Sequence, residues 1–379
     1  MASIQKRTRD GKVTWRAHYR TPDGIQRNRS FSLRREAERF ITEVEGAKLA
    51  GTYIEKDRSA VRVAEWVERW LESQAQLKPS TRERYAGILR THVTPKWGNY
   101  RLRDVSHADI QGWVSEVAQS RSASTATKAH RVLSLALGLA VRDGRLPRNP
   151  ADSVQLPRIV ARDRRYLTHA EVERLAAAAD EYGPLILFLA YTGARFGEAA
   201  ALRVSRLDLL RRRVEIAESA TSVNGRIVWG TPKGHQRRSI AYPRFLVDDL
   251  AALAAGKQPG DLVFVSPRGD VLRSSNFRRD VFEPAAYAAG LSGLTPHGLR
   301  HTAASLAIAS GADVKVVQQM MGHKSATMTL DLYGHLFTDR LDEVADRMDK
   351  ARADAAVARP LPEGTVVDLQ SVRNAAEGQ

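Results

Sequence analysis

The chain has 379 residues, 43% of them hydrophobic, which is enough for two or three folded domains. It contains no cysteine, and this excludes disulfide bonds, thiolate metal sites and cysteine nucleophiles. No apolar run approaches the roughly 18 residues of a membrane helix, and no apolar segment follows the charged start, so we expect a cytoplasmic protein without a secretion signal.

The positive charge is concentrated in the first 160 residues. The chain carries 59 Lys and Arg against 43 Asp and Glu, a formal net charge of +16. Residues 1–58 contribute +6 of this charge and residues 59–160 contribute +7. This distribution favours a polyanionic partner that contacts much of the chain. A solvated basic surface without any partner is the alternative that charge alone leaves open.

The first 58 residues show strand patterns followed by a helix. Alternating segments at Lys12–Tyr19 and Ile25–Phe31 flank the turn sequence Thr-Pro-Asp-Gly, which predicts a hairpin. A further strand is expected near Ser3–Arg9, and apolar residues spaced by three and four predict a helix over Leu33–Ala50. These elements form a small β-β-α module.

The next segment, from about Val61 to Val141, has a helical pattern throughout. Ser80 followed by Glu83 predicts a capping box at the start of one of its helices. The Asn149-Pro150 turn and the basic run that continues to Arg165 then predict a linker. We therefore expect a compact all-α unit.

A third unit begins with another expected capping box, formed by Thr168 and Glu171. Helices should continue to about Leu202, followed by short strands near Val214–Ile216 and Ile227–Trp229 and by further helices from Ser275. The predicted fold class is thus mostly α with small β elements, an α+β chain. The expected divisions are residues 1–58, 59–157, 158–350 and a tail at 351–379.

Two loops of the third unit carry isolated charged residues. Arg195 and Glu198 follow a Gly turn that ends an apolar helix, in the sequence Tyr-Thr-Gly-Ala-Arg-Phe-Gly-Glu. Lys233 lies at an expected hairpin tip between Trp229 and Ile240. Each of these charges alone could simply be solvated on the surface.

The segment Thr295-Pro-His-Gly-Leu-Arg-His301 indicates an anion site. Thr295 suits an N-cap and the proline suits the first helical position. This places His297 and Arg300 on one face of the first turn, where free backbone N–H groups favour a phosphate. The two residues could also merely decorate a helix start. His297 and His301 have a spacing found in zinc sites, but a metalloprotease glutamate and a third ligand are missing.

The last segment of interest contains His323 and, ten residues later, Tyr333. Ser325 can cap the helix that carries Tyr333, and Leu332 and Leu336 form part of its apolar side. A tyrosine beside such residues could belong only to the core.

In this order the segments form the pattern Arg, Lys, His-x-x-Arg, His, Tyr, which resembles the tyrosine recombinase (phage integrase) family over roughly residues 60–350. The segments HGLRHT, MGHKS and DLYGHL look like the diagnostic motifs of that family. The first 58 residues are similar to the arm-binding domain of some phage integrases. The resemblance therefore implies an arm-binding module, a helical core-binding domain and a mainly helical catalytic domain.

The resemblance also implies how each site residue acts. Tyr333 would attack DNA to leave a 3′-phosphotyrosine link, His297 would assist proton transfer, and Lys233 would protonate the departing oxygen. Arg195, Arg300 and His323 would donate hydrogen bonds to the phosphate, because phosphoryl transfer requires cations around the reacting group. Glu198 would orient the arginines. No cofactor and no metal is expected.

The implied partners are double-stranded DNA, at core-type and arm-type attachment sites, and three further copies of the chain in a tetramer. A host DNA-bending protein and an excisionase are the implied accessory partners, and the bacterial nucleoid is the implied location. A chromosome-dimer resolvase or a type IB topoisomerase would use the same catalytic residues. A DNA-binding regulator without catalysis is a third alternative, disfavoured because all six catalytic positions are filled.

Overall fold

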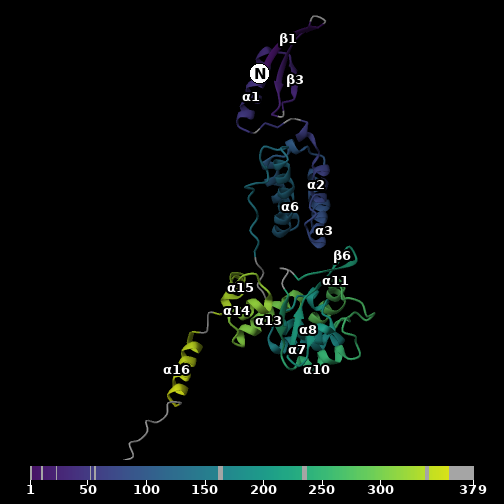
Figure 1. The fold of residues 1–379 in the computed structure, drawn as a ribbon, viewed down its shortest axis with the longest axis vertical. Coiled ribbons are helices and arrows are strands. Elements are labelled where there is room, and N and C mark those ends of the chain that lie inside the picture. Colours follow the sequence, from purple (N-terminus) through teal and green to yellow (C-terminus); the bar gives the residue numbers. More distant parts are fainter. Residues whose placement is uncertain are drawn as a thin grey trace, which may run out of the picture. The chain divides into compact units, whose positions relative to one another are not determined.

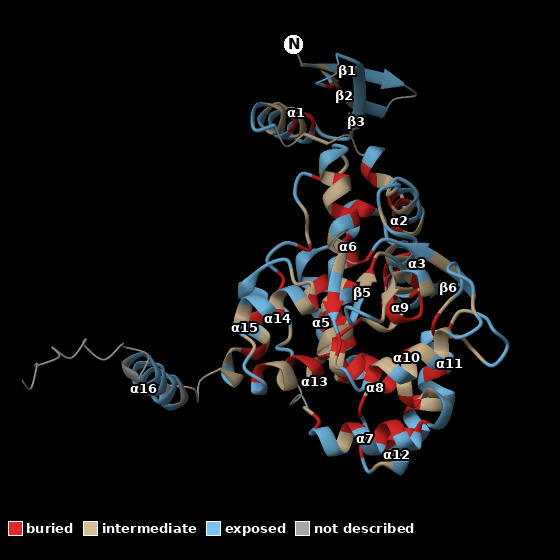
Figure 2. Cartoon of the chain, turned by 60° about the horizontal axis from the view of Figure 1, so that its bottom comes forward, coloured by how far each residue is buried: buried red, intermediate tan, exposed pale blue. Residues whose placement is uncertain are grey.

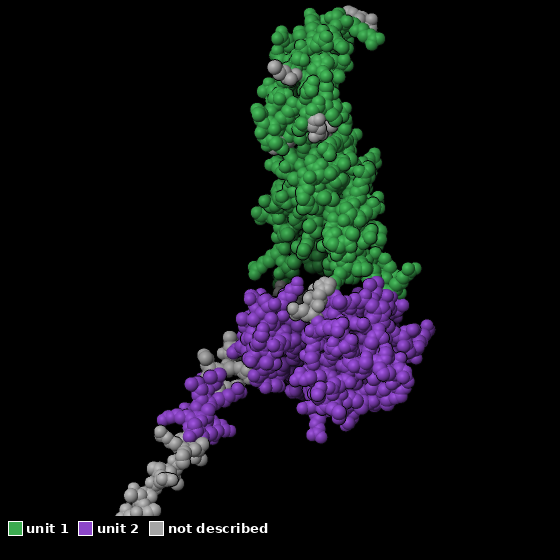
Figure 3. Space-filling model, viewed as in Figure 1, with its two compact units in different colours: residues 1–163, 222–226 green, residues 164–221, 227–379 purple. Residues whose placement is uncertain are grey.

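The computed structural model divides the chain into two compact units, residues 1–163 with 222–226 and residues 164–221 with 227–379 (Figure 3). None of the described helices has the length and apolar character needed to cross a membrane. The structure describes residues 2–9, 12–22, 24–51, 53–54, 57–160, 165–232, 237–337 and 341–357. The predicted Lys233 lies outside these residues.

The first module is a three-stranded antiparallel sheet with one helix, as expected. Its strands lie in the order β1 (Ser3–Arg9), β2 (Lys12–Arg20) and β3 (Gln26–Phe31), and the helix α1 (Arg34–Leu49) follows (Figure 1). Because side chains alternate along a strand, Trp15, Ala17 and Tyr19 share one face of β2. The ring of Tyr19 lies 5.3 Å from that of Phe40, so α1 covers this face.

The helical segment that follows has a tryptophan-rich core. The indole N–H of Trp66 donates to the carbonyl of Ala136 at 2.8 Å, and Trp97 is completely buried against Trp113. The α-helices of this segment are α2 (Val63–Glu72), α3 (Pro79–Ile88), α4 (Thr94–Trp97), α5 (His107–Ser120) and α6 (Ala123–Arg142), with a π-helical stretch at Leu89–Val93 between α3 and α4.

The expected capping box at Ser80 and Glu83 is wrong. Helix α3 begins at Pro79 with Lys78 as its N-cap, and no side chain caps it. Proline is favoured at the first helical position, where its missing N–H costs nothing, so the helix starts before Ser80. By contrast, the predicted capping box at Thr168 is confirmed, with Thr168 and Glu171 bonding reciprocally at the start of α7.

The second unit is built around the apolar helix α8 (Gly183–Thr192), most of which is buried (Figure 2). Helix α13 (Pro296–Ala309) packs along it. The other helices of this unit are α7 (His169–Ala178), α9 (Phe196–Ala199), α10 (Leu246–Ala254), α11 (Ser274–Phe277), α12 (Glu283–Ala288), α14 (Val314–Met321), α15 (Ala326–Tyr333) and α16 (Leu341–Val357), with short 3-10 or π-helical pieces between several of them.

Residues 207–241 contain two small antiparallel sheets. Strands β4 (Leu207–Asp208), β5 (Arg213–Ile216) and β8 (Arg238–Ala241) form one sheet, and β6 (Ser219–Val223) pairs with β7 (Arg226–Gly230). The strands expected near Val214 and Ile227 are confirmed as β5 and β7. The chain is mainly helical with small antiparallel sheets, which confirms the predicted fold class.

Candidate active site

Arg300 lies at the centre of a group of charged residues in the second unit. It extends from α13 and is only 4% exposed. Its two terminal nitrogens donate to the carbonyls of Gly193 and Met321. These carbonyls belong to the carboxyl ends of α8 and α14, where helix dipoles concentrate partial negative charge. The guanidinium therefore bridges two helix ends that stabilise a cation.

Burial and neighbouring charge lower the pKa of Arg300. Desolvation is the largest cause, and the positive charges of Arg195 and Arg238 act in the same direction, whereas Glu198 opposes them. The resulting pKa is about 9, so Arg300 remains protonated at neutral pH. The charges of the neighbouring arginines contribute to this lowering of the pKa, and a bound anion would oppose it.

Glu198 joins two arginines of this group. The Nη1 atom of Arg195 donates to its Oε1 atom at 2.9 Å, and the backbone N–H of Arg195 donates to Oε2 at 2.9 Å. Arg238, on β8, binds both oxygens of the same carboxylate, at 3.0 and 2.5 Å. This bidentate pairing fixes the planes of both groups.

The carboxylate of Glu198 is 1% exposed and remains ionised. Burial raises its pKa, but the hydrogen bond and charge of Arg238 and the contacts from Arg195 outweigh burial, so the pKa is below its ordinary value. Arg195, Arg238 and Arg300 thus share one negative partner, and the four groups together carry an excess of positive charge.

Two glycines allow these elements to approach closely. Gly193 has a φ of +64°, and a Cβ atom there would lie 2.2 Å from the Cε atom of Met321. Gly322 has a φ of +61°, and a Cβ atom there would lie 3.0 to 3.2 Å from the side chain of Arg238. Any other residue at Gly193 would be strained by the positive φ there and would displace the end of the Met321 side chain.

Tyr333, at the end of α15, is buried between two histidines. It is 1% exposed, and its hydroxyl lies 2.8 Å from Nδ1 of His301. The ring of His323 is nearly parallel to that of Tyr333, with an interplanar angle of 7° and centroids 6.4 Å apart. An electrostatic interaction also connects Tyr333 with Arg300.

His323 is neutral at pH 7. Burial, followed by the positive charges of Arg300, Arg195 and Arg238, lowers its pKa to about 4. Its Nδ1 atom lies 3.0 Å from Oγ1 of Thr329, which is itself buried. A neutral imidazole has one N–H, so His323 can donate one hydrogen bond rather than two.

The structure thus brings four of the predicted residues together, namely Arg195, Arg300, His323 and Tyr333. Glu198 contacts Arg195, as expected of a residue that orients it. His297 is exposed at the start of α13, and its ring lies 5.0 Å from that of His301. Thr295 and Pro296 occupy the predicted positions, although the Thr295 side chain forms no cap.

Sequence reasoning missed Arg238 and the contact of His301 with Tyr333. The spacing of His301 from His297 was interpreted only as that of a possible zinc site, although it also places His301 one helical turn along the same face. Nothing in the sequence signals that Arg238 pairs with Glu198, forty residues earlier. No group of three or more potential metal ligands occurs among the residues that the structure describes.

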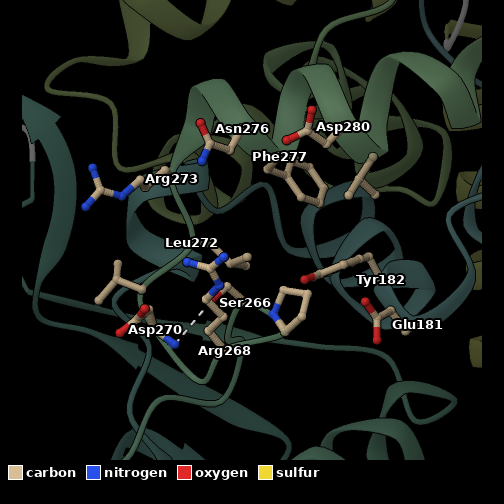
Figure 4. Close-up of a pocket in the computed structure, with 13 residues that line it drawn as sticks. Glu181, Tyr182, Ser266, Arg268, Asp270, Leu272, Arg273, Asn276, Phe277 and Asp280 are labelled. Carbon is tan, nitrogen blue, oxygen red and sulfur yellow. Dashed lines mark hydrogen bonds between the residues drawn. The ribbon is translucent and has the colours of Figure 1, made fainter. Parts of the chain in front are cut away.

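A separate concavity of about 550 Å³ lies elsewhere in the second unit (Figure 4). Its walls include Tyr182, Phe277 and Asp280, and it shares no residue with the arginine cluster. A hollow in the surface therefore does not identify the chemistry of this chain. The convergence of charged side chains on Tyr333 is the better guide.

Known families match both units of the chain. The family described as "Phage integrase family" matches residues 165–340, and "Phage integrase, N-terminal SAM-like domain" matches residues 63–118. The putative prophage phiRv2 integrase of Mycobacterium tuberculosis (strain ATCC 25618 / H37Rv) is 28% identical over 352 residues, covering 89% of this chain and 92% of that protein. Tyrosine recombinase XerC of Mycobacterium leprae is 30% identical over 288 residues, covering 70% of this chain and 92% of that protein.

Solved structures show a similar fold. A Tn1549 transposon integrase in complex with transposon right end DNA has a TM-score of 0.67 and 20% identity, covering 77% of this chain and all of that chain. A lambda integrase tetramer bound to a Holliday junction has a TM-score of 0.57 and 21% identity, covering 85% of this chain and 96% of that chain.

Replacing Arg238 tests the bridge to Glu198. Arg238→Ala leaves a buried carboxylate without its bidentate partner, so we expect the free energy of unfolding to fall by about 3 to 5 kcal/mol. Arg237→Ala is the matched control, because Arg237 is 71% exposed and lies 3.9 Å from Glu215. We expect that control to stay within about 0.5 kcal/mol. If denaturant unfolding shows the same loss of unfolding free energy in both variants, the stabilising contact between Arg238 and Glu198 is contradicted.

The pKa of His323 predicts a pH dependence. Between pH about 6.5 and 4 the unfolded chain binds a proton at His323 that the folded chain does not, so stability falls as the pH falls through this window. His323→Gln removes this titration. Between pH 7 and pH 5, the free energy of unfolding measured with denaturant should therefore fall more for the wild type than for the variant. The same loss in both would show that His323 is not held neutral.

Proposed function

Because the chain belongs to the phage integrase family of tyrosine recombinases, enzymes that cleave and rejoin DNA strands, we propose that it integrates and excises phage or mobile-element DNA at attachment sites. We propose that it does so through a 3′-phosphotyrosine intermediate on Tyr333. The observation that carries this proposal is the convergence of Arg195, Arg300 and His323 around that tyrosine.

The arginine cluster suits a phosphodiester. A guanidinium has five N–H donors, and the carbonyls of Gly193 and Met321 hold the orientation of Arg300 while further N–H groups remain for an anion. Arg195 is held by Glu198 in a comparable way. Donors fixed before the reaction need no reorganisation as charge develops, and loss of one such donor costs roughly 2.7 to 4 kcal/mol of transition-state stabilisation.

In the proposed reaction the Tyr333 oxygen forms a bond to phosphorus while the bond from phosphorus to the 5′ oxygen breaks. Lys233 donates a proton to the departing oxygen, and His297 assists proton transfer. Attack by the 5′-hydroxyl of another strand reverses these steps. The phosphotyrosine link conserves the bond energy, so religation requires no hydrolysis of ATP.

Tyr333 must become accessible before it can react, because it is 1% exposed in the chain without DNA. Helices α13, α14 and α15 enclose it in a small apolar cluster with Ala303, Ile308, Val317 and Met321. This cluster is distinct from the larger core around α8. We infer that DNA binding shifts α15 or rotates the tyrosine without disturbing the larger core.

The amino-terminal sheet supports a second DNA contact, at arm-type sites. The strand register places one side of the sheet against α1 and gives the other side polar residues only. Arginine, asparagine and glutamine are among the side chains that read base edges, and a β-ribbon fits the major groove. This second face consists of Ser3, Gln5, Arg7, Arg9, Lys12, Thr14, Arg16, His18, Arg20, Gln26, Asn28 and Ser30.

We propose that the chain acts as a homotetramer on core-type DNA, by analogy with the lambda integrase tetramer of similar fold. An excisionase and a host DNA-bending protein are the proposed accessory partners. A chromosome-dimer resolvase is the second candidate, favoured by the similarity to XerC. The prophage integrase is similar over 89% of this chain and XerC over 70%, so we prefer the integrase.

The nucleophile can be tested with a nicked DNA substrate that traps the covalent intermediate. Tyr333→Phe should bind this DNA as the wild type does but form no covalent adduct, since the attacking oxygen is gone. Tyr191→Phe is the matched control, because the Tyr191 hydroxyl also bonds to a histidine, His169 at 2.7 Å. Adduct formation should persist in the control. An adduct formed by Tyr333→Phe would refute the assignment.

The sheet can be tested in the full chain with a duplex that contains the DNA flanking its own coding sequence. If Arg16 contacts a phosphate, Arg16→Ala should weaken binding and reduce the slope of log affinity against log salt by about 0.9. Arg39→Ala, on α1, is the control, because Arg39 is 84% exposed and pairs with Glu43. Equal effects of both changes would argue against the sheet as the binding face.

A further inference from the structure

His301 is the residue whose nitrogen is hydrogen-bonded to the Tyr333 hydroxyl. Its Nδ1 atom lies 2.8 Å from the oxygen, within the range of a strong hydrogen bond. Tyr333 is 1% exposed and His301 is half-buried, so the contact is partly shielded from solvent. The roles assigned above to His297, His323 and Lys233 leave His301 unused.

The other histidines are placed differently with respect to the phenol. His323 lies parallel to the tyrosine ring, with centroids 6.4 Å apart, and its Nδ1 atom is bonded to Thr329. His297 is exposed, and its ring meets His301 edge-on. His301 is therefore the histidine that offers a ring nitrogen to the tyrosine oxygen in the arrangement shown.

Helix packing holds this nitrogen in place. His301 follows the buried Arg300 on α13, and Thr302 beyond it is buried and accepts the backbone N–H of Leu167 at 3.1 Å. Helix α13 is thus anchored on both sides of His301. Helix α8, which packs against α13, contains no charged residue.

We propose that His301 is a catalytic residue that accepts the phenolic proton of Tyr333, which deepens the proposed function and rests on it. The Tyr333 oxygen forms its bond to phosphorus, the O–H proton moves to Nδ1 of His301, and the 5′ oxygen leaves with a proton from Lys233. In religation the proton returns from His301 to the tyrosine oxygen. In this step the hydrogen of the neutral His301 ring is on Nε2, and the lone pair of Nδ1 accepts the phenolic O–H.

The charges around the pair suit this transfer. Proton transfer creates an imidazolium next to Tyr333, which itself interacts with the Arg300 cation, and the added positive charge costs energy in the chain without DNA. The bound phosphodiester adds a negative charge at the same position and offsets that cost. A base within hydrogen-bond reach accelerates such a step by about 10²-fold to 10⁴-fold.

The decisive variant is His301→Asn. The asparagine side chain places a polar atom close to the position of Nδ1 and can retain the hydrogen bond, but it cannot accept a proton. We expect the wild-type affinity for core DNA and adduct formation about 10² to 10⁴ times slower. His301→Gln is the second variant, to be used if His301→Asn fails to bind DNA.

Two chemical changes, one in the tyrosine and one in the DNA, distinguish a residue that accepts a proton from a residue that donates one. A fluorinated tyrosine at position 333, with a more acidic phenol, should restore adduct formation in His301→Asn at least tenfold. DNA with sulfur in place of the departing 5′ oxygen should rescue Lys233→Ala but not His301→Asn, because a thiolate leaves without a proton.

Wild-type adduct rates in both His301 variants, or rescue of His301→Asn by the sulfur-containing DNA, would overturn the proposal. Either result leaves Tyr333 as the nucleophile. If instead Tyr333→Phe forms the adduct, the proposed function itself fails. The two failures are therefore distinguishable.

Discussion

The position of Arg300 between two helix ends is the constraint on which the candidate site depends. Burial of a lone guanidinium is unfavourable, and the chain compensates with the carbonyls of Gly193 and Met321 at the carboxyl ends of α8 and α14. This arrangement joins the large core around α8 to the small cluster that holds Tyr333. In the proposed reaction, Arg300 thus meets both a structural requirement and a phosphate-binding requirement.

The same cluster determines the protonation of its neighbours. Glu198 stays ionised because Arg238 and Arg195 outweigh the effect of its burial on its pKa. His323 stays neutral because it is buried near three arginines. Without DNA the cluster has more positive than negative charge, and a phosphodiester supplies what is missing. This excess of positive charge supports the proposed binding of a phosphodiester at the cluster.

Local sequence signals predicted those parts of the chain that depend on near neighbours. The capping box at Thr168 and the strands of the first module are confirmed. Helix α3 instead begins at Pro79, so the capping box predicted at Ser80 does not form. Long-range contacts were not predictable. The pairing of Arg238 with Glu198 requires β8 to lie beside α9, and the contact of His301 with Tyr333 requires α13 to pack on α15. Neither proximity leaves a periodic pattern in the sequence.

The claim that Tyr333 is the residue that reacts with DNA can be tested by locating the covalent bond. The protein first reacts with a DNA substrate that traps the covalent intermediate. Trypsin cleaves after Lys and Arg, so it then releases residues 325–340 as one peptide, in which Tyr333 is the one tyrosine. After nuclease digestion, mass spectrometry should find the added nucleotide on that peptide and fragmentation should place it on Tyr333. A nucleotide found on any other residue would contradict the account.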